Sequence, residues 1–600
     1  MDTRWIQTGS PIPSEGYADQ PYIVKTDDGA WLLVMTTGSG HEGDPGQHVV
    51  TMRSRDFGKS WEPPVDVEPK AGPEASYAVM LKARSGRIYC FYNHNTDRVK
   101  EVRREDNGVY KRVDSLGHFV FKYSDDHGRS WSRERYEVPV REFDCDRKNV
   151  YGGKLRFFWN VGRPVVHRDA ALVPLHKVGA MGAGFFAQSE GAILRSPNIL
   201  TEADPRKITW ETLPDGKVGL RTPRGGGRVS EEQSLSVMSD GSLYCVYRSI
   251  DGWPVESYSR DGGHTWSAPQ YKTQTPGGRR MKHPRAANFA WRCANGNYLY
   301  WYHNHGGAAT RTLPAPWDPY ADRNPVWLAA GVERPGQDGP VIHWSEPEIA
   351  LYDDDPFIRM SYPDLIEEDG RYFLTETQKT VGRVHEVDPG LIAGLFNQWD
   401  AESIPTQGLL LERTTPPAQG EQIVLPKLPE FVSRDSARAD FGTRDNRAGI
   451  SVAFWLRLTS YLPGQVVLTN RTPQGHGFSM ELGEGGRLIA RFGDGRTSTE
   501  WSSDAGVLKT GTSQHVVWTL DGGPKVTYFV VDGRLNDGGD ERQFGWGRWS
   551  PHLRSLNGSR ELRVTPGGGN VAVETLRIYG RALRVSEAVS SFQAARRHRK

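Results

Sequence analysis

One eight-residue phrase occurs three times in the first half of this 600-residue chain, with the pattern S-x-D-x-G-x-[S/T]-W. Each fixed position has a structural reason: Asp caps a turn with its carboxylate, Gly adopts a positive φ angle, and Trp packs its ring beneath the turn. The copies occupy residues 54–61, 124–131 and 259–266. Their recurrence predicts a repeated β architecture in which each copy marks the same turn of the repeating unit.

Composition limits the class of protein. Six hundred residues are too many for one hydrophobic core, which predicts two or more domains. The formal net charge is +2, with basic and acidic residues interspersed, so nucleic acid is not expected as a partner. No apolar run is long enough to span a bilayer, and residues 1–4 lack the apolar core of a secretion signal, which predicts a soluble protein as given.

The cysteines are predicted to be buried free thiols. There are four, far apart in the sequence, and three lie inside apolar strand patterns, as Cys90 does. None has the spacing of a metal site, so we expect no metal and no cofactor.

The repeated phrase is the Asp-box of the sialidase superfamily, and the chain resembles these β-propellers from about residue 17 to about residue 386. The resemblance implies an all-β fold of four-stranded blades. Pairs of β runs around Asp-Gly or Asn-Gly turns place six blades, with seven still possible. They begin near residues 21, 77, 155, 232, 286 and 362; blade three runs to about residue 210 without a recognisable box, and the N-terminal strand is expected to close blade six. We assign residues 1–412 to this six-bladed β-propeller.

A polar, Pro-rich stretch then predicts a linker over residues 413–425. Alternating apolar segments at 450–458, 515–520, 526–533 and 574–579 predict a β-sandwich over 426–600. Their order resembles laminin-G-like or concanavalin A-like jelly rolls. Such domains often bind glycans, but a packing module without a ligand fits the sequence equally well.

A propeller gathers the innermost strands of all its blades around one central pocket, so functional side chains are expected where those strands begin. In sialidases three arginines clamp the substrate carboxylate, an Asp is the acid/base, and a Glu activates a Tyr nucleophile. Matching distances from shared landmarks imply these positions here: Asp44 as acid/base, Glu232 as base, Tyr362 as nucleophile, and Arg248 and Arg285 as sugar-holding arginines, with His283 beside them.

One departure from the resemblance bears on the substrate. The Arg-Ile-Pro signature of sialidases is replaced here by Asp19, Gln20 and Pro21. A carboxylate in place of the first clamp arginine would repel the carboxylate of sialic acid, at a cost of several kcal/mol in a partly buried pocket. Terminal sialic acid is therefore disfavoured, and Asp19 would suit sugar hydroxyls.

Each of these residues also has a purely structural interpretation. Asp44 lies in a Gly-Asp-Pro-Gly turn, where Asp needs no catalytic role. Glu231 would take the place of Glu232 after a register shift of one residue, Tyr362 fits an ordinary strand position, and Arg248 fits an ion pair with Glu232.

A second set of residues resembles the propeller-type polysaccharide lyases, which act on uronates. In those enzymes Arg neutralises the sugar carboxylate, while His and Tyr remove the C5 proton and protonate the leaving oxygen. The matching residues are His94, His118, Tyr151 and Arg163; a hairpin would bring the two histidines side by side. Each histidine alone also fits a hydrogen-bonded strand residue.

His303 and His305 alternate along a strand as a metal pair would, but they lack an acidic or Cys partner, so sugar contact by His303 is favoured. We therefore expect a carbohydrate-active enzyme whose partner is a polysaccharide or oligosaccharide. Exo-acting hydrolysis is favoured over uronate lysis, and a non-catalytic glycan-binding protein is the third alternative. Secretion or export to the periplasm is expected, with a cytoplasmic location left open.

Overall fold

The computed structural model describes residues 2–114, 118–182, 186–306, 322–440, 442–567 and 569–598. The chain forms two compact units. The first contains Ile6–Trp344 and Asp355–Pro389, and the second contains Met1–Trp5, Ser345–Asp354 and Gly390–Lys600. Residues 307–321, which fall inside the stretch predicted as blade five, lie outside the described residues.

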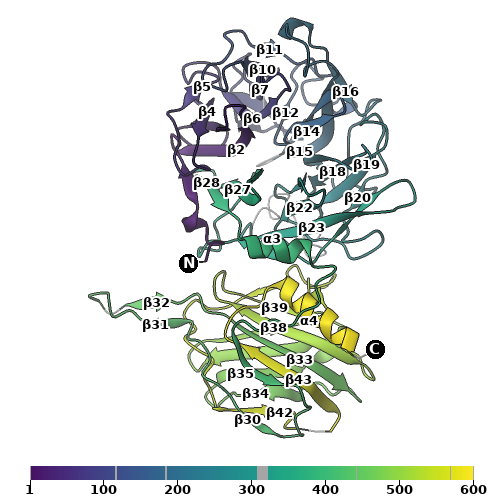
Figure 1. The fold of residues 1–600 in the computed structure, drawn as a ribbon. Coiled ribbons are helices and arrows are strands. Elements are labelled where there is room, and N and C mark those ends of the chain that lie inside the picture. The colour runs from purple at the N-terminus through teal and green to yellow at the C-terminus, as the bar shows by residue number, and fades with distance from the viewer. Residues whose placement is uncertain are drawn as a thin grey trace. The chain divides into compact units, whose positions relative to one another are not determined.

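The first unit is a ring of antiparallel sheets that follow one another around a common centre (Figure 1). The first three blades, each given from its inner strand outward, are β2 (Tyr17–Lys25), β3 (Trp31–Gly38), β4 (His48–Ser54) and β5 (Val65–Asp66); β6 (Ala75–Lys82), β7 (Ile88–His94), β10 (His118–Ser124) and β11 (Tyr136–Glu137); and β12 (Phe158–Trp159), β14 (Ala170–Met181), β15 (Phe186–Ser196) and β16 (Glu211–Leu213).

The other three blades follow the same order. They are β17 (Glu231–Val237), β18 (Leu243–Arg248), β19 (Val255–Ser259) and β20 (Gln270–Tyr271); β21 (Phe289–Arg292), β22 (Tyr298–Tyr302), β23 (Val326–Arg334) and β24 (Val341–Trp344); and β26 (Leu365–Glu368), β27 (Arg371–Thr377), β28 (Gly382–Glu386) and β1 (Ser10–Ile12). Short additions to the ring are η1 (Ile6–Thr8), β8 (Glu101–Arg103), β9 (Val109–Lys111), α1 (Asp144–Arg147), β13 (Val165–His167) and η2 (Pro205–Lys207).

The prediction of six blades is confirmed by the six propeller sheets of the described residues. The N-terminal strand closes the ring, because β1 pairs with β28 of the last blade. Blade three ends a few residues later than the sequence indicated. The Asn198 side chain accepts a hydrogen bond from Thr209 N and donates one to Lys207 O, which holds this segment in a turn, so the fourth strand begins at Glu211.

The three Asp-boxes occupy the same place in blades one, two and four, between the third and fourth strands. In the first box, Asp56 accepts hydrogen bonds from the backbone N–H and the hydroxyl of Ser60, and Gly58 has φ 77°. Asp126 and Asp261 make the corresponding bonds in the other two boxes. The boxes therefore brace the outer turns of the blades, as the pattern predicted.

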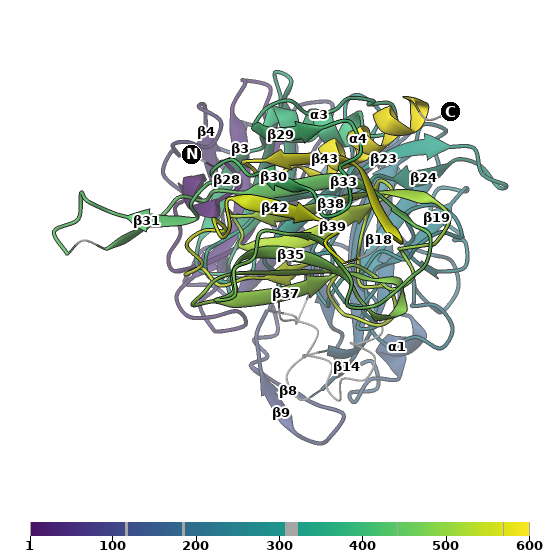
Figure 2. The same cartoon turned by 90° about the horizontal axis from the view of Figure 1, so that it is seen from below.

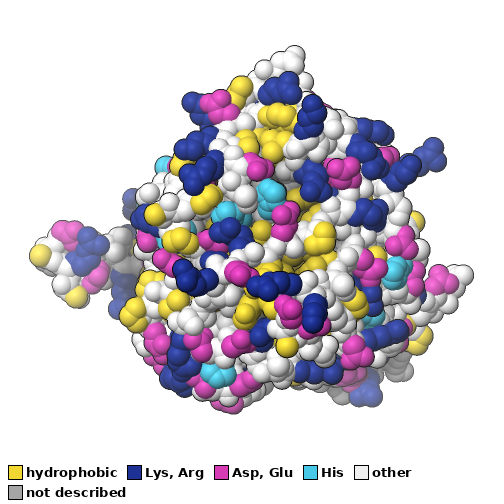
Figure 3. Space-filling view, turned by 90° about the horizontal axis from the view of Figure 1, so that it is seen from above, with side chains coloured by type: hydrophobic (Ala, Val, Ile, Leu, Met, Phe, Trp, Pro, Cys, Tyr) yellow, Lys and Arg dark blue, Asp and Glu magenta, His cyan; other side chains and the backbone are white. Residues whose placement is uncertain are grey.

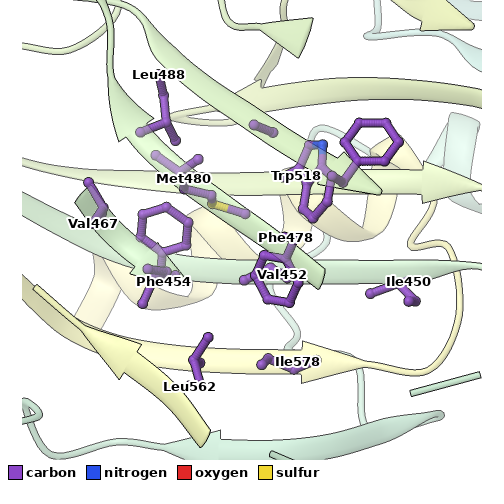
Figure 4. Packing of buried hydrophobic residues seen from close by; sticks show 14 of the residues in the cluster. Ile450, Val452, Phe454, Val467, Phe478, Met480, Leu488, Trp518, Leu562 and Ile578 are labelled. Atoms are coloured by element: carbon purple, nitrogen blue, oxygen red, sulfur yellow. The ribbon is translucent and has the colours of Figure 1, made fainter. Parts of the chain in front are cut away.

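The second unit is a sandwich of two sheets whose inner faces enclose one hydrophobic core, including Phe454, Phe478 and Trp518 (Figure 4). One sheet runs β29 (Leu409–Arg413), β43 (Val571–Tyr579), β33 (Ile450–Leu458), β38 (Ser513–Asp521), β39 (Val526–Val531) and β40 (Arg534–Leu535), with β41 (Gly547–Arg548) on β39. The other runs β30 (Gln422–Val424), β42 (Glu561–Val564), β34 (Val466–Thr469), β35 (His476–Leu482), β36 (Leu488–Asp494) and β37 (Ser498–Ser502).

The predicted linker and the end of the stretch assigned to the propeller both contribute to this sandwich, because β30 pairs with β42 and β29 pairs with β43. A charged hairpin of β31 (Val432–Arg434) and β32 (Thr443–Asp445) projects from the sheets, as Figure 2 shows. The remaining elements of this part of the chain are β25 (Glu348–Leu351), α3 (Pro389–Phe396), η4 (Glu484–Gly486) and α4 (Val585–His598).

A buried lysine between blades four and five predicts an unusual pH dependence of stability. Lys272 is 0% exposed, and its ammonium lies 3.6 Å from the ring centroid of Trp344 and 2.9 Å from the Tyr244 hydroxyl. Burial lowers its pKa from 10.5 to about 7, although Glu256 opposes this shift. The folded pKa is thus below the unfolded one, so between about pH 7 and 10.5 the unfolded chain binds more protons, and stability rises with pH across this window.

We therefore expect the Lys272→Met variant to lose this rise, which should amount to a few kcal/mol at about 1.4 kcal/mol per pKa unit. Urea unfolding of both proteins at pH 7.5 and pH 9.5 measures it; equal pH dependence in the two proteins would contradict the assignment.

Candidate active site

Four inner strands share one backbone feature where they approach the centre of the ring. Gln20, Tyr77, Glu232 and Tyr362 have φ angles of 54°, 59°, 58° and 49°. In the first three cases the strand pairing slips at this point, as a β-bulge does. A bulge turns two successive side chains away from strict alternation, and a positive φ in a residue other than Gly costs roughly 1–3 kcal/mol. Such strain, repeated in four blades, points to a functional centre.

The central contact joins Tyr362 and Glu232. The Tyr362 hydroxyl donates a hydrogen bond of 2.9 Å to Glu232 Oε1, and the two residues are 3% and 1% exposed. Burial raises the pKa of Glu232, and burial followed by the charge of Glu232 raises the pKa of Tyr362 well above 10. A phenol is thus held against a carboxylate whose basicity is increased by its surroundings.

Two arginines lie beside this pair and share one carboxylate. Arg248 Nε is 2.7 Å from Glu231 Oε2, Arg285 Nη2 is 2.8 Å from Glu231 Oε1, and Arg248 Nη1 is 3.0 Å from Glu232 Oε2. Burial opposes ionisation of Glu231, but the charges of Arg285 and Arg248 outweigh it and lower its pKa to about 2. Glu231 is therefore an anion that neutralises the arginines, and Glu232 is the partner of Tyr362.

A lysine near the Tyr362 ring joins two acidic residues. Lys379 Nζ is 2.8 Å from Asp19 Oδ2 and 3.1 Å from Glu42 Oε2, and it lies 4.3 Å from the ring centroid of Tyr362. Burial raises the pKa of Asp19, which is 0% exposed. Burial also acts to raise the pKa of Glu42, but the cations Lys379 and Arg112 hold it well below its usual range.

The segment after β9 adds a fourth cation. Arg112 Nη2 is 2.6 Å from Glu42 Oε1 and 2.8 Å from the Tyr77 hydroxyl, and Arg112 Nε is 2.5 Å from Asp114 Oδ1. The Trp159 ring stacks on Tyr77 at 4.0 Å and lies 4.5 Å from the Arg112 guanidinium carbon. The centre therefore combines five carboxylates with four cations in direct contact.

The structure brings together Glu232, Tyr362, Arg248, Arg285 and Asp19 of the residues selected from the sequence. Asp44 is placed differently. Its carboxylate accepts a hydrogen bond of 2.7 Å from His41 N and is 49% exposed. Among the described residues, none of its hydrogen bonds or ion pairs reaches Glu232 or Tyr362.

Both ring nitrogens of His283 have partners in the protein, whereas the buried Nε2 of His303 has no hydrogen-bond partner among the described residues. His283 Nε2 is 2.7 Å from Ala286 O, and His283 Nδ1 accepts a hydrogen bond of 3.2 Å from His303 N. The rings stack at 5.6 Å, and burial lowers the pKa of His283 to about 3. The expectation that His283 holds the sugar is corrected by this geometry, because both of its ring nitrogens are bonded within the turn that leads to Arg285. The sugar contact expected of His303 stays a prediction.

The four residues of the lyase alternative have different contacts in the structure. His94 and His118 pair directly opposite each other on β7 and β10, as expected, and His118 also contacts Glu137 and Asp97. The Tyr151 hydroxyl accepts a hydrogen bond from Arg103 N.

Arg163 pairs with Asp364 at 3.1 Å and lines a cavity of about 660 Å³ formed by the later residues of the inner strands, such as Ile23 and Ser234. Among the described residues, no hydrogen bond or ion pair joins Arg163 or Tyr151 to His94 or His118.

Three residues of this centre, Glu42, Arg112 and Lys379, are not predicted by any motif in the sequence. Glu42 was two residues from the chosen Asp44, and only the turn geometry decides which carboxylate points inward. Tyr77 opens the second inner strand as Tyr362 opens the sixth, a parallel that was visible in the sequence. Lys379 and Arg112 lie in a turn and in an insertion that carry no motif.

Two further findings concern metals and membranes. In the described part of the chain, no group of three or more His, Cys, Asp or Glu side chains could hold a metal ion. No described helix has the length and apolar character needed to cross a membrane.

The face in Figure 3 carries acidic and basic side chains interspersed, without a large patch of one sign.

The two units match two known families. Residues 78–374 match the model of the BNR repeat-like domain family, and residues 434–588 match the model of the concanavalin A-like lectin/glucanases superfamily. These matches confirm the resemblance drawn from the Asp-boxes and from the C-terminal strand order. No curated protein matches the chain in sequence.

Solved structures that the chain matches include sialidases. Trypanosoma rangeli sialidase is 14% identical, with 98% of this chain and 97% of that chain covered and a TM-score of 0.40. A protein of unknown function from Dyadobacter fermentans is 15% identical, with coverages of 63% and 97% and a TM-score of 0.43. The NanB sialidase of Streptococcus pneumoniae is 13% identical, with coverages of 63% and 68% and a TM-score of 0.41. At these TM-scores the similarities do not bear on the chemistry of the site.

Proposed function

We propose that the chain is an exo-acting glycoside hydrolase of the BNR-repeat class in which Tyr362 is the nucleophile and Glu232 its base. The observation that supports this most is the buried hydrogen bond of 2.9 Å between the phenol and the carboxylate. In the first step the phenol oxygen bonds to the anomeric carbon, its proton passes to Glu232, and the bond to the leaving oxygen breaks with proton transfer to that oxygen. Water then releases the sugar from Tyr362.

The substrate we propose is a sugar without a carboxylate at the reacting ring. Asp19 occupies the position where the resemblance implies a clamp arginine, and it is already paired with Lys379 at 2.8 Å. Glu231 lies between Arg248 and Arg285, so the positive charge of both guanidinium groups is balanced within the protein. A sialic acid carboxylate would add an uncompensated negative charge here, which is costly in a buried site. Sugar hydroxyls suit these carboxylates better as partners.

The leaving oxygen needs a proton donor, and we retain Asp44 in this role. Glu42 extends further into the centre, but its ion pairs with Arg112 and Lys379 keep it ionised, which suits a partner of cations and not an acid. Among the described residues, the one ion-pair partner recorded for Asp44 is His41, whose Nδ1 lies 3.6 Å from the carboxylate.

The Asp44→Asn variant tests this assignment. We expect it to lose roughly 100- to 10,000-fold in rate on natural glycosides, and much less on aryl glycosides whose leaving group needs no proton. Steady-state kinetics on both kinds of substrate measure the difference. An equal loss of rate on natural and aryl glycosides would contradict the acid role of Asp44. Glu42→Gln is the comparison variant.

The uronate lyase remains the second candidate, because His94 and His118 pair directly opposite each other on β7 and β10. A panel of neutral, sialylated and uronate-containing glycans separates the two. A hydrolase creates a new reducing end, whereas a lyase creates an unsaturated uronate that absorbs in the ultraviolet. We expect reducing ends without absorbance. Absorbance on a uronate polymer would support the lyase, and binding without cleavage would support a glycan-binding protein.

A further inference from the structure

Lys379 stands in a turn whose backbone is fixed at several points. It follows β27, has φ 72°, and its N–H donates a hydrogen bond of 2.8 Å to Thr377 Oγ1. Its carbonyl accepts a hydrogen bond of 2.9 Å from Ala18 N, next to Asp19. A left-handed conformation in a residue with a side chain is costly and persists only where the surroundings impose it. The turn therefore directs the lysine side chain to a fixed place beside the first blade.

That place lies between two carboxylates and one phenol ring. The ammonium is 2.8 Å from Asp19 and 3.1 Å from Glu42, and 4.3 Å from the centroid of the Tyr362 ring. Its side chain is 26% exposed, whereas those of Arg112, Arg248 and Arg285 are 5%, 1% and 0% exposed. Lys379 is thus the most accessible of these four cations.

Lys379 pairs with two of the charged groups that act on the Tyr362 phenol. Four groups act on Tyr362 besides burial: the charges of Glu232, Glu42 and Asp19 raise its pKa, and Arg248 lowers it. Negative charge that develops on the phenol oxygen during attack is therefore opposed by two carboxylates that take no proton from it. Lys379 bonds to both, and Arg112 bonds to Glu42 as well.

We propose that Lys379 is a positioning residue of the Tyr362–Glu232 site, which holds Asp19 and Glu42 in ion pairs so that their charges do not oppose the charge that develops on the phenol oxygen. This rests on the proposed hydrolase function. It also explains how the site tolerates Asp19 where the resemblance implies an arginine: blade six supplies the missing positive charge. The ammonium acts on these charges over a short distance, because it lies 2.8 Å from the buried carboxylate of Asp19 and 4.3 Å from the ring centroid of the buried Tyr362.

Charge compensation tests the proposal. We expect Lys379→Met to lower kcat by about 100-fold with a smaller change in KM, because the ground-state sugar carries no charge for the lysine to bind. Lys379→Arg should retain most of kcat. Removing the two carboxylates as well, in Lys379→Met/Asp19→Asn/Glu42→Gln, should bring kcat back to within about tenfold of the wild type. As a matched control, Lys25→Met removes a lysine that pairs with Glu368 at 2.7 Å and should leave kcat unchanged.

A second measurement needs no substrate. Thermal unfolding of the wild type, Lys379→Met, Asp19→Asn and the double variant forms a cycle that reports the coupling of Lys379 and Asp19. We expect the single lysine variant to have the lowest Tm and the double variant to recover most of the loss. If no variant hydrolyses any glycan while this coupling persists, the proposed function fails and the ion pair stands. If hydrolysis is present but Lys379→Met is fully active, or the triple variant stays as inactive as Lys379→Met, the positioning role is overturned.

Discussion

The Tyr362→Phe variant is expected to lose about 1,000-fold or more of its hydrolytic activity, because the phenyl ring keeps the packing but has no oxygen to form the covalent intermediate. The hydrogen bond to Glu232 is the only contact of the Tyr362 hydroxyl that the described structure records, so the fold should survive the change. The measurement is kcat/KM on whichever glycan of the panel is cleaved, together with the unfolding temperature.

Tyr247→Phe is the matched control for this prediction. Tyr247 is equally buried and donates a hydrogen bond of 2.8 Å to Arg221 O, away from the cluster. It should lose a little stability and no activity. Full activity in Tyr362→Phe would contradict the nucleophile assignment, and loss of activity in both variants would indicate a general sensitivity to removal of buried hydroxyls.

Substitution of two adjacent glutamates is expected to affect two different properties, the catalytic rate for one and the stability for the other. Glu232→Gln should lower kcat by roughly 100- to 10,000-fold, because the amide cannot take the phenol proton. Glu231→Gln should instead destabilise the protein by about 3–5 kcal/mol, because Arg248 and Arg285 lose the carboxylate that they share in a buried position.

Kinetics and urea unfolding of the two variants separate these effects. A large stability loss in Glu232→Gln with little change in kcat, together with an inactive but stable Glu231→Gln, would exchange the two roles.

The fold could be predicted from the sequence because its signals are local. An Asp-box holds its turn by bonds among residues four apart, such as those of Asp56 with Ser60, and the same turn recurs in three blades. Blade three, without a box, could be placed only approximately, since its last strand depends on how Asn198 holds residues 207–209. The beginning of the sandwich was also hidden, because the pairing of β30 with β42 joins segments more than a hundred residues apart.

The candidate site could be predicted only in part. Glu232 and Tyr362 begin inner strands at recognisable distances from turns, and the structure brings them into contact. Strict strand alternation would have placed Glu231 and Glu232 on opposite faces, but the bulge directs both inward. Lys379 and Arg112 come from a turn and an insertion, where only the three-dimensional structure shows that they meet Glu42.

The most direct test of the account is the stereochemistry of cleavage. Proton NMR of the first product formed from a cleaved glycan reports the configuration at the anomeric carbon before it equilibrates. Two successive displacements at Tyr362 predict a sugar released with its original configuration and with no unsaturated uronate. A product of inverted configuration would exclude a covalent Tyr362 intermediate, and an unsaturated uronate would replace hydrolysis with elimination.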